Sequence, residues 1–280
     1  MSRQPDRPPP PPVVQRLRIR YAKRDRMRFT SHRDVARALE RALRRAQLPM
    51  AYSAGFSPHP KVSYAGASPT GVASEAEYLE IALAEHREPD DVRRSLDAAL
   101  PPGLDIVEVV EAAPGASLGE RIAASRWRVE LREVDPGDVE AAVARFLALD
   151  TAPVERPTKD GTRTVDARAA VVHLAIAEYG PSMGPNPRLV GSGAASGGDL
   201  VTCAILDLVV RHTTPAVRPD DVMMALRQAA ALPTPVTPLV TRLAQGLLDE
   251  TLSASDGTPD HPVRLIDPLA ADAAEAPPQH

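Results

Sequence analysis

Cysteine is almost absent from this sequence, and its scarcity excludes several kinds of site. The 280 residues contain one cysteine, Cys203, within the apolar run Thr202–Leu206, where a small buried hydrophobic residue is expected. A single cysteine forms no internal disulfide and cannot supply the thiolates of an iron–sulfur cluster. No cofactor is predicted for this chain.

Long hydrophobic runs and the common catalytic motifs are also missing. No apolar stretch approaches the roughly 20 residues of a membrane span, and the proline-rich N-terminal residues contain no signal-peptide core, so a cytoplasmic protein is predicted. There is no phosphate-binding glycine-rich loop before a helix. The seven histidines never adopt a metal-ligand spacing such as His-x-x-x-His. We therefore predict neither a metal site nor catalytic residues.

Proline and apolar content together predict the domain organisation. Hydrophobic residues make up 43% of the chain and aromatic residues only 3%, so the core must consist mainly of Ala, Val and Leu. Of the thirty prolines, six lie within residues 1–14 and five within residues 249–280, more than these short stretches would hold by chance. Residues 1–14 are predicted to be a disordered Pro-rich lead, and residues 249–280 a disordered acidic tail. Two modules, 15–113 and 125–248, lie between them.

The first module alternates short strands with two helices. Strands are predicted at Gln15–Lys23, Leu48–Tyr52, Lys61–Ala65, Tyr78–Leu83 and Leu104–Val110, and helices from Ser31 to Ala46 and over Glu88–Leu100. Met27–Thr30 is predicted to be a short extended continuation. This order favours a ferredoxin-like (βαββαβ-type) sandwich, in which both helices cover one face of a sheet.

The second module repeats this theme without a detectable residue-level repeat. Its predicted helices are Pro136–Leu149 and Arg218–Leu232, and its predicted extended segments are Trp127–Glu133, Val154–Arg156, Arg163–Arg168, Val171–Glu178 and Leu200–Val210. Gly191–Gly198 is predicted to be a flexible hairpin loop. The predicted fold class is α+β, with two ferredoxin-like modules in tandem and disordered termini.

Positive charge is concentrated in one part of a chain whose net charge is −4. Residues 16–61 contain 13 Lys or Arg and three acidic residues, which leaves +10 in this segment. Such asymmetry is typical of a phosphate-binding surface on an otherwise acidic protein. The alternative is a solvated arginine-rich face without a ligand.

The start of the first helix combines a capping signal with cationic residues. Ser31 and Asp34 match the Ser-x-x-acid signature of a helix N-terminus. His32 begins the helix, and a helix N-terminus favours an anion. The alternative for His32 is a purely structural packing or capping role. Candidate ligand-binding residues in this region are Arg28, Ser31, His32, Arg33 and Arg37.

A proline-stiffened loop follows this helix. Gly55-Phe56-Ser57-Pro58-His59-Pro60 cannot be helical, and the two prolines restrict the backbone on both sides of His59. Rigid presentation of His59 followed by Lys61 suits an anionic or flat ligand, while the alternative is a turn whose imidazole satisfies a backbone carbonyl. Tyr52 and Phe56 flank the loop and could stack on a base. We add Tyr52, Phe56, His59 and Lys61 to the candidate RNA-binding residues.

A hairpin tip is predicted at Lys159-Asp160-Gly161 in the second module, because Asp-Gly is a turn signal. Arg163 and Arg168 follow this turn. They are the remaining candidate RNA-binding residues, since they could extend the basic surface.

Several motifs of the first module together resemble a known family, the radical-SAM-linked proteins, whose defining region is a domain of unknown function. The motifs are Arg20-Tyr21-x-Lys23, Arg28-Phe29-Thr30-Ser31-His32-Arg33-Asp34, Glu40-Arg41-Ala42-Leu43-Arg44-Arg45-Ala46, Tyr52-Ser53-x-Gly55-Phe56-Ser57-Pro58-His59-Pro60-Lys61 and Gly71-Val72-x-Ser74-Glu75-Ala76-Glu77-Tyr78-Leu79. The resemblance covers roughly residues 15–245 and is most specific over 28–80.

The resemblance implies partners rather than catalytic residues. In that family the domain is fused to, or encoded beside, a radical SAM enzyme with a cobalamin-binding-type domain, and a ribonuclease E/G-type protein is often a genomic neighbour. This chain lacks the three-cysteine motif of the fused members, so the radical SAM protein would be a separate polypeptide.

Three functional hypotheses follow. The first is an accessory or substrate-presenting module that works with a separate radical SAM enzyme on RNA, such as tRNA or rRNA. The second is a metal-independent RNA-processing or modifying enzyme that uses His32 and His59 as acid and base, together with Lys61. The third is a protein–protein scaffold whose basic face docks on an acidic partner.

Overall fold

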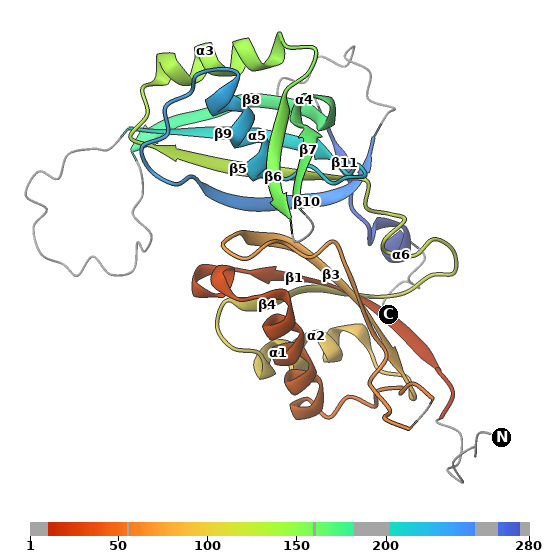
Figure 1. The fold of residues 1–280 in the computed structure, drawn as a ribbon. Coiled ribbons are helices and arrows are strands. Elements are labelled where there is room, and N and C mark those ends of the chain that lie inside the picture. The colour runs from red at the N-terminus through yellow and green to blue at the C-terminus, as the bar shows by residue number, and fades with distance from the viewer. Residues whose placement is uncertain (1–10, 55, 159–160, 182–201, 250–262, 275–280) are drawn as a thin grey trace, which may run out of the picture. The chain divides into compact units, whose positions relative to one another are not determined.

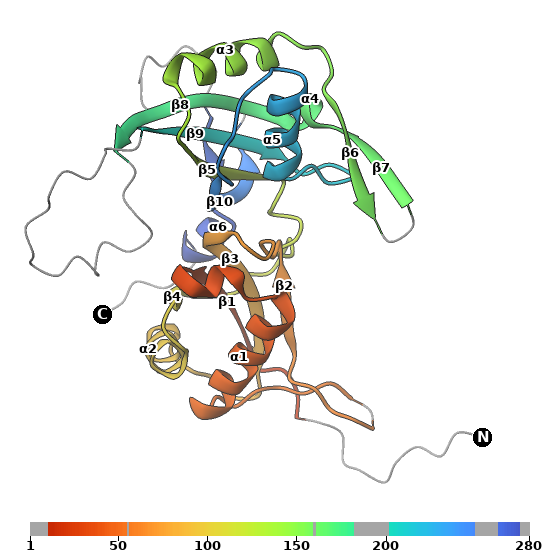
Figure 2. The same cartoon turned by 60° about the vertical axis from the view of Figure 1, so that its left-hand side comes forward.

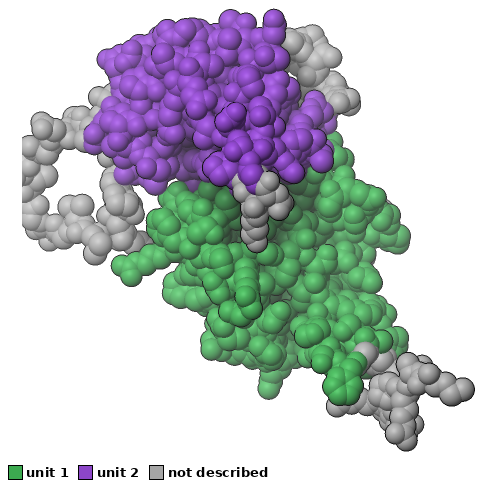
Figure 3. Space-filling model, viewed as in Figure 1, with its two compact units in different colours: residues 1–122, 244–247, 266–280 green, residues 123–243, 248–265 purple. Residues whose placement is uncertain are grey.

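The chain folds into two compact units, and its C-terminal part contributes segments to each of them in turn. The computed structural model describes residues 11–54, 56–158, 161–181, 202–249 and 263–274. Unit 1 comprises residues 1–122, 244–247 and 266–280, and unit 2 comprises residues 123–243 and 248–265 (Figure 3). The first division between the units, after Ile122, falls in the segment that the sequence analysis left between the two modules.

Unit 1 is an α+β unit whose sheet is antiparallel in each strand pair described here (Figure 1). β1 lies between β3 and β4, and β2 pairs with β3. The elements are β1 (Gln15–Lys23), the 3-10 helix η1 (Asp25–Phe29), α1 (His32–Arg45), β2 (Val62–Ala65), β3 (Ala73–Leu83), α2 (Pro89–Ala99) and β4 (Leu104–Glu111). Near the C-terminus, part of β10 (Leu239–Leu248), Ile266 of β11 (Leu265–Ile266) and α6 (Ala270–Ala274) complete the unit.

Successive side chains of β1 point to opposite faces of this sheet. Leu17, Ile19 and Tyr21 are buried in one hydrophobic cluster with the apolar sides of α1 and α2, so both helices cover the same face. The intervening arginines lie on the opposite face, where a smaller cluster joins Tyr78 to Leu269. The predicted strand Gln15–Lys23 is therefore confirmed, and the face that carries its arginines is not fully exposed, because Arg18 is buried.

Unit 2 is also an α+β unit, and its central strands pair antiparallel in the order β5-β9-β8. Its elements are β5 (Ala124–Arg132), α3 (Pro136–Leu147), β6 (Pro153–Thr158), β7 (Gly161–Asp166), α4 (Ala167–Ala170), β8 (Val171–Pro181), β9 (Thr202–Arg211), α5 (Pro219–Gln228) and the first part of β10, which pairs with β5. Helix α3 packs on β8, β9 and α5. Figure 2 shows β6 and β7 as a separate two-stranded ribbon.

Most predicted elements are present, and several local predictions are wrong. Leu48–Tyr52 is not a strand but makes only two isolated bridges, Met50 with Leu83 and Tyr52 with Pro60. The stretch predicted to continue as an extended chain after β1 is the 3-10 helix η1. The predicted extended segment from Arg163 ends at Asp166, because the Asp166 carboxylate accepts backbone N–H bonds that start α4.

The structure of the C-terminal segment also differs from the prediction. Residues 249–280 were predicted to be disordered, yet residues 263–274 form β11 and α6, and Asp272 is buried. Strand β10 was not predicted at all. The predicted β6–β7 hairpin is confirmed by its pairing, while its tip residues 159–160 and the loop Gly191–Gly198 lie outside the described residues. Among the described residues, no helix is both long and apolar enough to cross a membrane.

Candidate functional site

Helix α1 begins where the sequence predicted, and its first turn is capped. The Ser31 hydroxyl accepts a hydrogen bond from the backbone N–H of Asp34 at 3.2 Å and donates to the Asp34 carboxylate at 2.7 Å. This contact satisfies one of the free N–H groups at the helix start. Ser31 therefore has a structural role at the position where it was predicted to bind a ligand.

Four arginines form a row along the outer side of α1. Arg33, Arg37, Arg41 and Arg44, here called the α1 ridge, are all exposed. At 3.6 residues per turn they fall within a sector of about 80°. The opposite side of the helix carries its buried residues.

Most arginines of the α1 ridge have no carboxylate partner among the described residues. Arg37 lies 3.4 Å from the carboxylate of Asp34, one turn away on the helix. In the described part of the chain, Arg33, Arg41 and Arg44 have no ion-pair partner. An exposed guanidinium without a carboxylate is available to a phosphate.

The cationic residues of β1, together with Arg24 just after it, are bound to protein groups instead. Arg16 and Arg18 both contact Glu80, Arg18 also contacts Asp272, Arg20 contacts Glu108 and Asp267, Arg24 contacts Glu75 and Asp105, and Lys23 donates to the carbonyl of Pro69. The +10 balance of residues 16–61 therefore overstates the charge that a ligand can reach.

Arg18 is the most enclosed of the β1 arginines. Its side chain is 4% exposed, and its guanidinium donates to both carboxylate oxygens of Asp272 at 2.8 and 2.9 Å. Burial acts to lower the pKa of Arg18, but the hydrogen bonds from its guanidinium to Asp272 and Glu80 outweigh this effect and raise the pKa above its ordinary value. Arg18 is thus a fixed structural cation.

Two of the three phenylalanines are exposed, and both lie in the basic segment. Phe29 is 67% exposed and Phe56 is 92% exposed, whereas Phe146 is fully buried. Phenylalanine is usually buried, and aromatic residues make up only 3% of this chain. Two exposed phenylalanine rings are therefore unusual. Phe29 was not among the predicted site residues, although its position between Arg28 and the helix cap could have indicated it.

Arg28 is fixed beside Phe29. Its guanidinium lies 5.9 Å from the centre of the Phe29 ring, and its Nε donates to the carbonyl of Gly71 at 2.9 Å. The backbone N–H of Gly71 donates in return to the Arg28 carbonyl at 2.7 Å. These two hydrogen bonds attach the 3-10 helix η1, which contains Phe29, to the loop before β3.

His32 lies at the start of α1 and packs against β2. Its exposed ring meets the ring of Tyr64 edge-on, with centroids 5.1 Å apart. The Tyr64 hydroxyl is buried and has no hydrogen-bond partner among the described residues. Burial, followed by the nearby Glu40 carboxylate, raises the pKa of Tyr64, so this phenol stays neutral.

The proline loop is closed by backbone hydrogen bonds. The N–H of Ser53 donates to the carbonyl of His59 at 2.9 Å, and the N–H of His59 donates to the Ser53 hydroxyl at 3.1 Å. Lys61 donates its backbone N–H to the Ala51 carbonyl at 2.8 Å. The loop is thus fixed by its backbone, while the side chains of Tyr52, His59 and Lys61 are exposed.

The structure brings some predicted residues together and separates others. Arg28, Ser31, His32, Arg33 and Arg37 share η1 and the start of α1. No contact of the described residues joins His32 to His59 or to Lys61. Tyr64, the partner of His32, lies three residues beyond Lys61 along extended chain, a span of about 10 Å.

The two candidates of the second module belong to unit 2. Arg163 is exposed on β7, opposite Arg156. Arg168 donates to the carbonyls of Val171 and Leu147, both at 3.4 Å, so it has a local structural role in α4. In the described part of the chain there is no group of three or more His, Cys, Asp or Glu arranged to hold a metal ion.

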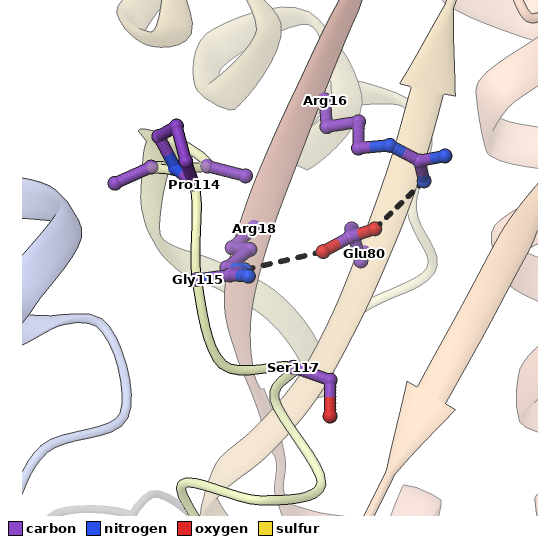
Figure 4. A pocket seen from close by; sticks show the side chains of 8 residues that line it. Arg16, Arg18, Glu80, Pro114, Gly115 and Ser117 are labelled. Atoms are coloured by element: carbon purple, nitrogen blue, oxygen red, sulfur yellow. Dashed lines mark hydrogen bonds and ion pairs between the residues drawn. The ribbon is translucent and has the colours of Figure 1, made fainter.

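A pocket that the sequence did not indicate lies on the β1 face opposite the helices (Figure 4). It has a volume of about 400 Å³. The carboxylate of Glu80 lies between the guanidinium groups of Arg16 and Arg18 and contacts both. The rest of the pocket's lining is Ala112, Ala113, Pro114, Gly115 and Ser117.

One comparison with known proteins bears on identity. A family model described as an uncharacterized protein conserved in bacteria, DUF2344, matches residues 16–219. No curated protein matches the sequence. The match covers most of both units and contains the α1 ridge, the proline loop and all of the pocket's lining. The chain therefore belongs to the DUF2344 family of uncharacterized bacterial proteins.

Proposed function

We propose that the chain is a non-catalytic RNA-binding module that presents RNA to a separate radical SAM enzyme. The observation that carries the RNA part is the combination, within unit 1, of the α1 ridge with the exposed rings of Phe29 and Phe56. Because a cytoplasmic RNA would be the substrate, a cytoplasmic location is part of the proposal.

The α1 ridge supplies the contacts that do not depend on sequence. Guanidinium groups neutralise phosphates and release counterions, which supplies most of the non-specific affinity for nucleic acid. Arg33, Arg41 and Arg44 have no carboxylate to displace, so they keep this capacity in the free protein. Arg18 and Arg20 of β1 lack it, because each contacts two acidic side chains.

The exposed rings supply a place for unpaired bases. Stacking of a base on an aromatic side chain is tolerant of sequence and requires a single-stranded or extruded nucleotide. Phe29 is suited to this role because Arg28 and Gly71 fix its short helix, and Phe56 because the proline loop is closed by the Ser53–His59 contacts. We therefore propose single-stranded RNA as the ligand.

The same strand arrangement recurs in the two units, and we propose that both are ferredoxin-like modules. In unit 1 the order β1-α1-β2-β3-α2-β4 accompanies a sheet in which β1 and β3 are central. In unit 2 the corresponding elements are β5, α3, β8, β9, α5 and β10, with β5 and β9 central. The β6–β7 ribbon and α4 are then an insertion. Tandem modules of this kind suit an RNA-presenting role.

The radical SAM partner is proposed from the family resemblance and the chemistry of this chain. Cys203 is the single cysteine, is buried, and cannot ligate an iron–sulfur cluster. The cluster would therefore belong to a separately encoded enzyme. A ribonuclease E/G-type protein is a second proposed partner. Purification of the tagged chain from its native cells should recover an iron–sulfur protein of the radical SAM class, and its repeated absence would contradict this part of the proposal.

The RNA part is tested with a matched pair of charge-removing variants. Arg33→Gln with Arg41→Gln removes two unpaired charges from the α1 ridge. Arg93→Gln with Arg94→Gln removes one half-buried and one exposed charge from α2, where each arginine is paired with an aspartate. Affinity for a short single-stranded RNA, measured by fluorescence anisotropy at low salt, should fall about tenfold for the first variant and little for the second. Equal reductions in both would reject α1 as the binding surface.

The two other functional hypotheses are outcomes of further measurements. The enzyme hypothesis requires His32 and His59 to act on one phosphate, and it would gain support if RNA were cleaved and His59→Ala abolished the cleavage. The scaffold hypothesis would gain support if the full chain bound no RNA but retained an acidic protein through the α1 ridge. Neither has a structural observation in its favour comparable to the exposed rings.

A further inference from the structure

We propose that the pocket beside Arg16 binds a terminal phosphate group. Arg16, Arg18 and Glu80 lie on the sheet face opposite α1 and α2, because they alternate with residues of the core that those helices cover. The pocket is therefore a different site from the α1 ridge. With about 400 Å³ it is large enough for a phosphate and the sugar attached to it.

The carboxylate that lines the pocket is already engaged by both arginines. One carboxylate oxygen of Glu80 accepts from Arg16 at 2.9 Å, and the other accepts from Arg18 at 3.1 Å. The carbonyl of Ala116, next to the lining residues, accepts from Arg18 at 3.0 Å. A ligand that offers only hydrogen-bond donors would thus find few partners here.

The group that remains available is a donor. Arg16 makes one side-chain hydrogen bond among the described residues, from Nη1 to Glu80, and its side chain is 53% exposed. Its Nε and Nη2 atoms form the second edge of the planar guanidinium. That edge has the fork geometry that binds two oxygens of a phosphate or carboxylate.

The orientation of Arg16 is set by Glu80, which belongs to a chain of contacts that leads into the buried Arg18–Asp272 pair. Glu80 is held by the nearly buried Arg18, which is held by Asp272 of α6. Asp272 also accepts from Arg121 at 2.8 Å and from the backbone N–H of Ala113 in the pocket wall at 3.0 Å. Arg16 therefore has its geometry before a ligand arrives, which lowers the entropy cost of binding.

The charge balance favours an anion. The connected side chains are three arginines, Arg16, Arg18 and Arg121, and two carboxylates, Glu80 and Asp272, which leaves one positive charge. A terminal phosphate carries more charge than a carboxylate or a phosphodiester, so Coulomb attraction favours it at the same distance. That this phosphate belongs to an RNA end or a nucleotide, and not to another metabolite, rests on the proposed function.

The probe for this site is inorganic phosphate, titrated into the full chain and followed by calorimetry or by phosphorus NMR line broadening. Arg16→Gln should weaken binding about tenfold or more, because it removes the charge and the fork. Arg16→Lys should retain part of the affinity, since it keeps the charge alone. Arg94→Gln, at another exposed arginine with one acidic partner, should leave it unchanged.

Two results would overturn the site. One is the lack of saturable phosphate binding to the wild-type protein, and the other is equal binding by wild type and Arg16→Gln. Thermal unfolding of each variant shows whether it is folded, and the half-exposed position of Arg16 makes a folded Arg16→Gln variant the expected result.

Further arms distinguish the source of the phosphate and keep this site separate from the α1 ridge. Tighter binding of adenosine monophosphate than of inorganic phosphate would indicate a nucleotide, and tighter binding of 5′-phosphorylated RNA than of 5′-hydroxyl RNA would indicate an RNA end. Arg33→Gln with Arg41→Gln should leave phosphate binding unchanged, and Arg16→Gln should leave binding of 5′-hydroxyl RNA unchanged. Loss of one activity without the other would therefore show which proposal has failed.

Discussion

The arginines of β1 and those of α1 are close in the sequence, but the fold places them in different surroundings. On β1, Arg18 and Arg20 each meet two carboxylates from other elements. On α1, Arg33, Arg41 and Arg44 are exposed and have no ion-pair partner among the described residues. A basic stretch of sequence thus contains both a structural network and a surface that can bind a ligand.

The difference follows from the geometry of the two elements. Alternate residues of β1 project from one face of the sheet, next to β3 and β4, whose facing positions carry Glu80 and Glu108. On α1 the arginines recur at intervals of three and four residues, on the side away from the core. Charge density along the sequence therefore does not measure the charge available to a partner.

Removing Asp272 should have the largest effect on stability. Asp272→Ala leaves Arg18 and Arg121 without their shared carboxylate, whose side chain has no exposed surface. Loss of one partner of a buried ion pair typically costs about 3–5 kcal/mol. We expect a corresponding fall in the free energy of unfolding, measured by urea denaturation.

The control for this experiment lies on α1. Arg37→Ala removes an exposed arginine whose one carboxylate partner is also exposed, and it should change the free energy of unfolding by about 0.5 kcal/mol or less. If both variants were destabilised equally, the division of the arginines into structural and available groups would be wrong.

The phenylalanines allow the same division to be tested with uncharged side chains. Phe29→Ala and Phe56→Ala should each weaken RNA binding by about 1–3 kcal/mol, or roughly 5- to 150-fold, because each removes a stacking surface. Both should leave stability nearly unchanged, since the rings are exposed. Phe146→Ala, at a buried site, should instead cost about 3–5 kcal/mol of stability. Unaltered RNA affinity in both exposed-site variants would remove the stacking proposal.

Ser31→Ala tests how far the ridge depends on the helix cap. The variant removes the hydrogen bond from the Asp34 N–H, and loss of an N-cap typically costs about 1 kcal/mol. Thermal unfolding should show this decrease, and Ser31→Asn, which can also cap, should restore most of it. A fully stable alanine variant would mean that other contacts define the start of α1.

Arg24 lies between the two groups and should give the smallest effect. It contacts Glu75 and Asp105 but is almost half exposed, and its hydrogen bond to Glu75 raises its pKa above the ordinary value. Partly exposed pairs contribute about 1 kcal/mol or less. Arg24→Gln should therefore lower stability slightly and leave RNA affinity unchanged. A large fall in RNA affinity would move Arg24 into the ligand-binding group.

Local signals in the sequence predicted much of the fold. Ser31 and Asp34 predicted the start of α1, and the strand predicted at Gln15–Lys23 has the bounds of β1. The Asp-Gly turn predicted the β6–β7 hairpin. In each case the residues that decide the structure are neighbours in the sequence, so their pattern is visible without a fold.

Features that depend on distant partners were not predictable in this way. The C-terminal residues are rich in alanine and acidic residues, yet α6 is held because Asp272 reaches Arg18, 254 positions away. Leu48–Tyr52 has the composition of a strand but makes only isolated bridges. The pocket beside Arg16 is formed by β1, β3 and the loop after β4, so no single stretch of sequence could reveal it.

The candidate site was only partly predictable, because some of its features also depend on distant partners. Sequence reasoning located the basic helix and the proline loop, but it could not separate Arg18 from Arg33, because the carboxylate partners of Arg18 come from other elements. It also omitted Phe29, whose exposure depends on the hold of Arg28 and Gly71 on η1.

The salt dependence of RNA binding tests the central claim most directly. For single strands, the slope of log affinity against log salt falls in magnitude by about 0.7 for each phosphate that the protein no longer neutralises. Arg33→Gln with Arg41→Gln should therefore reduce the slope by about 1.4, whereas Arg93→Gln with Arg94→Gln should leave it at the wild-type value. The same slope in all three proteins would contradict the assignment of the α1 ridge to RNA phosphates.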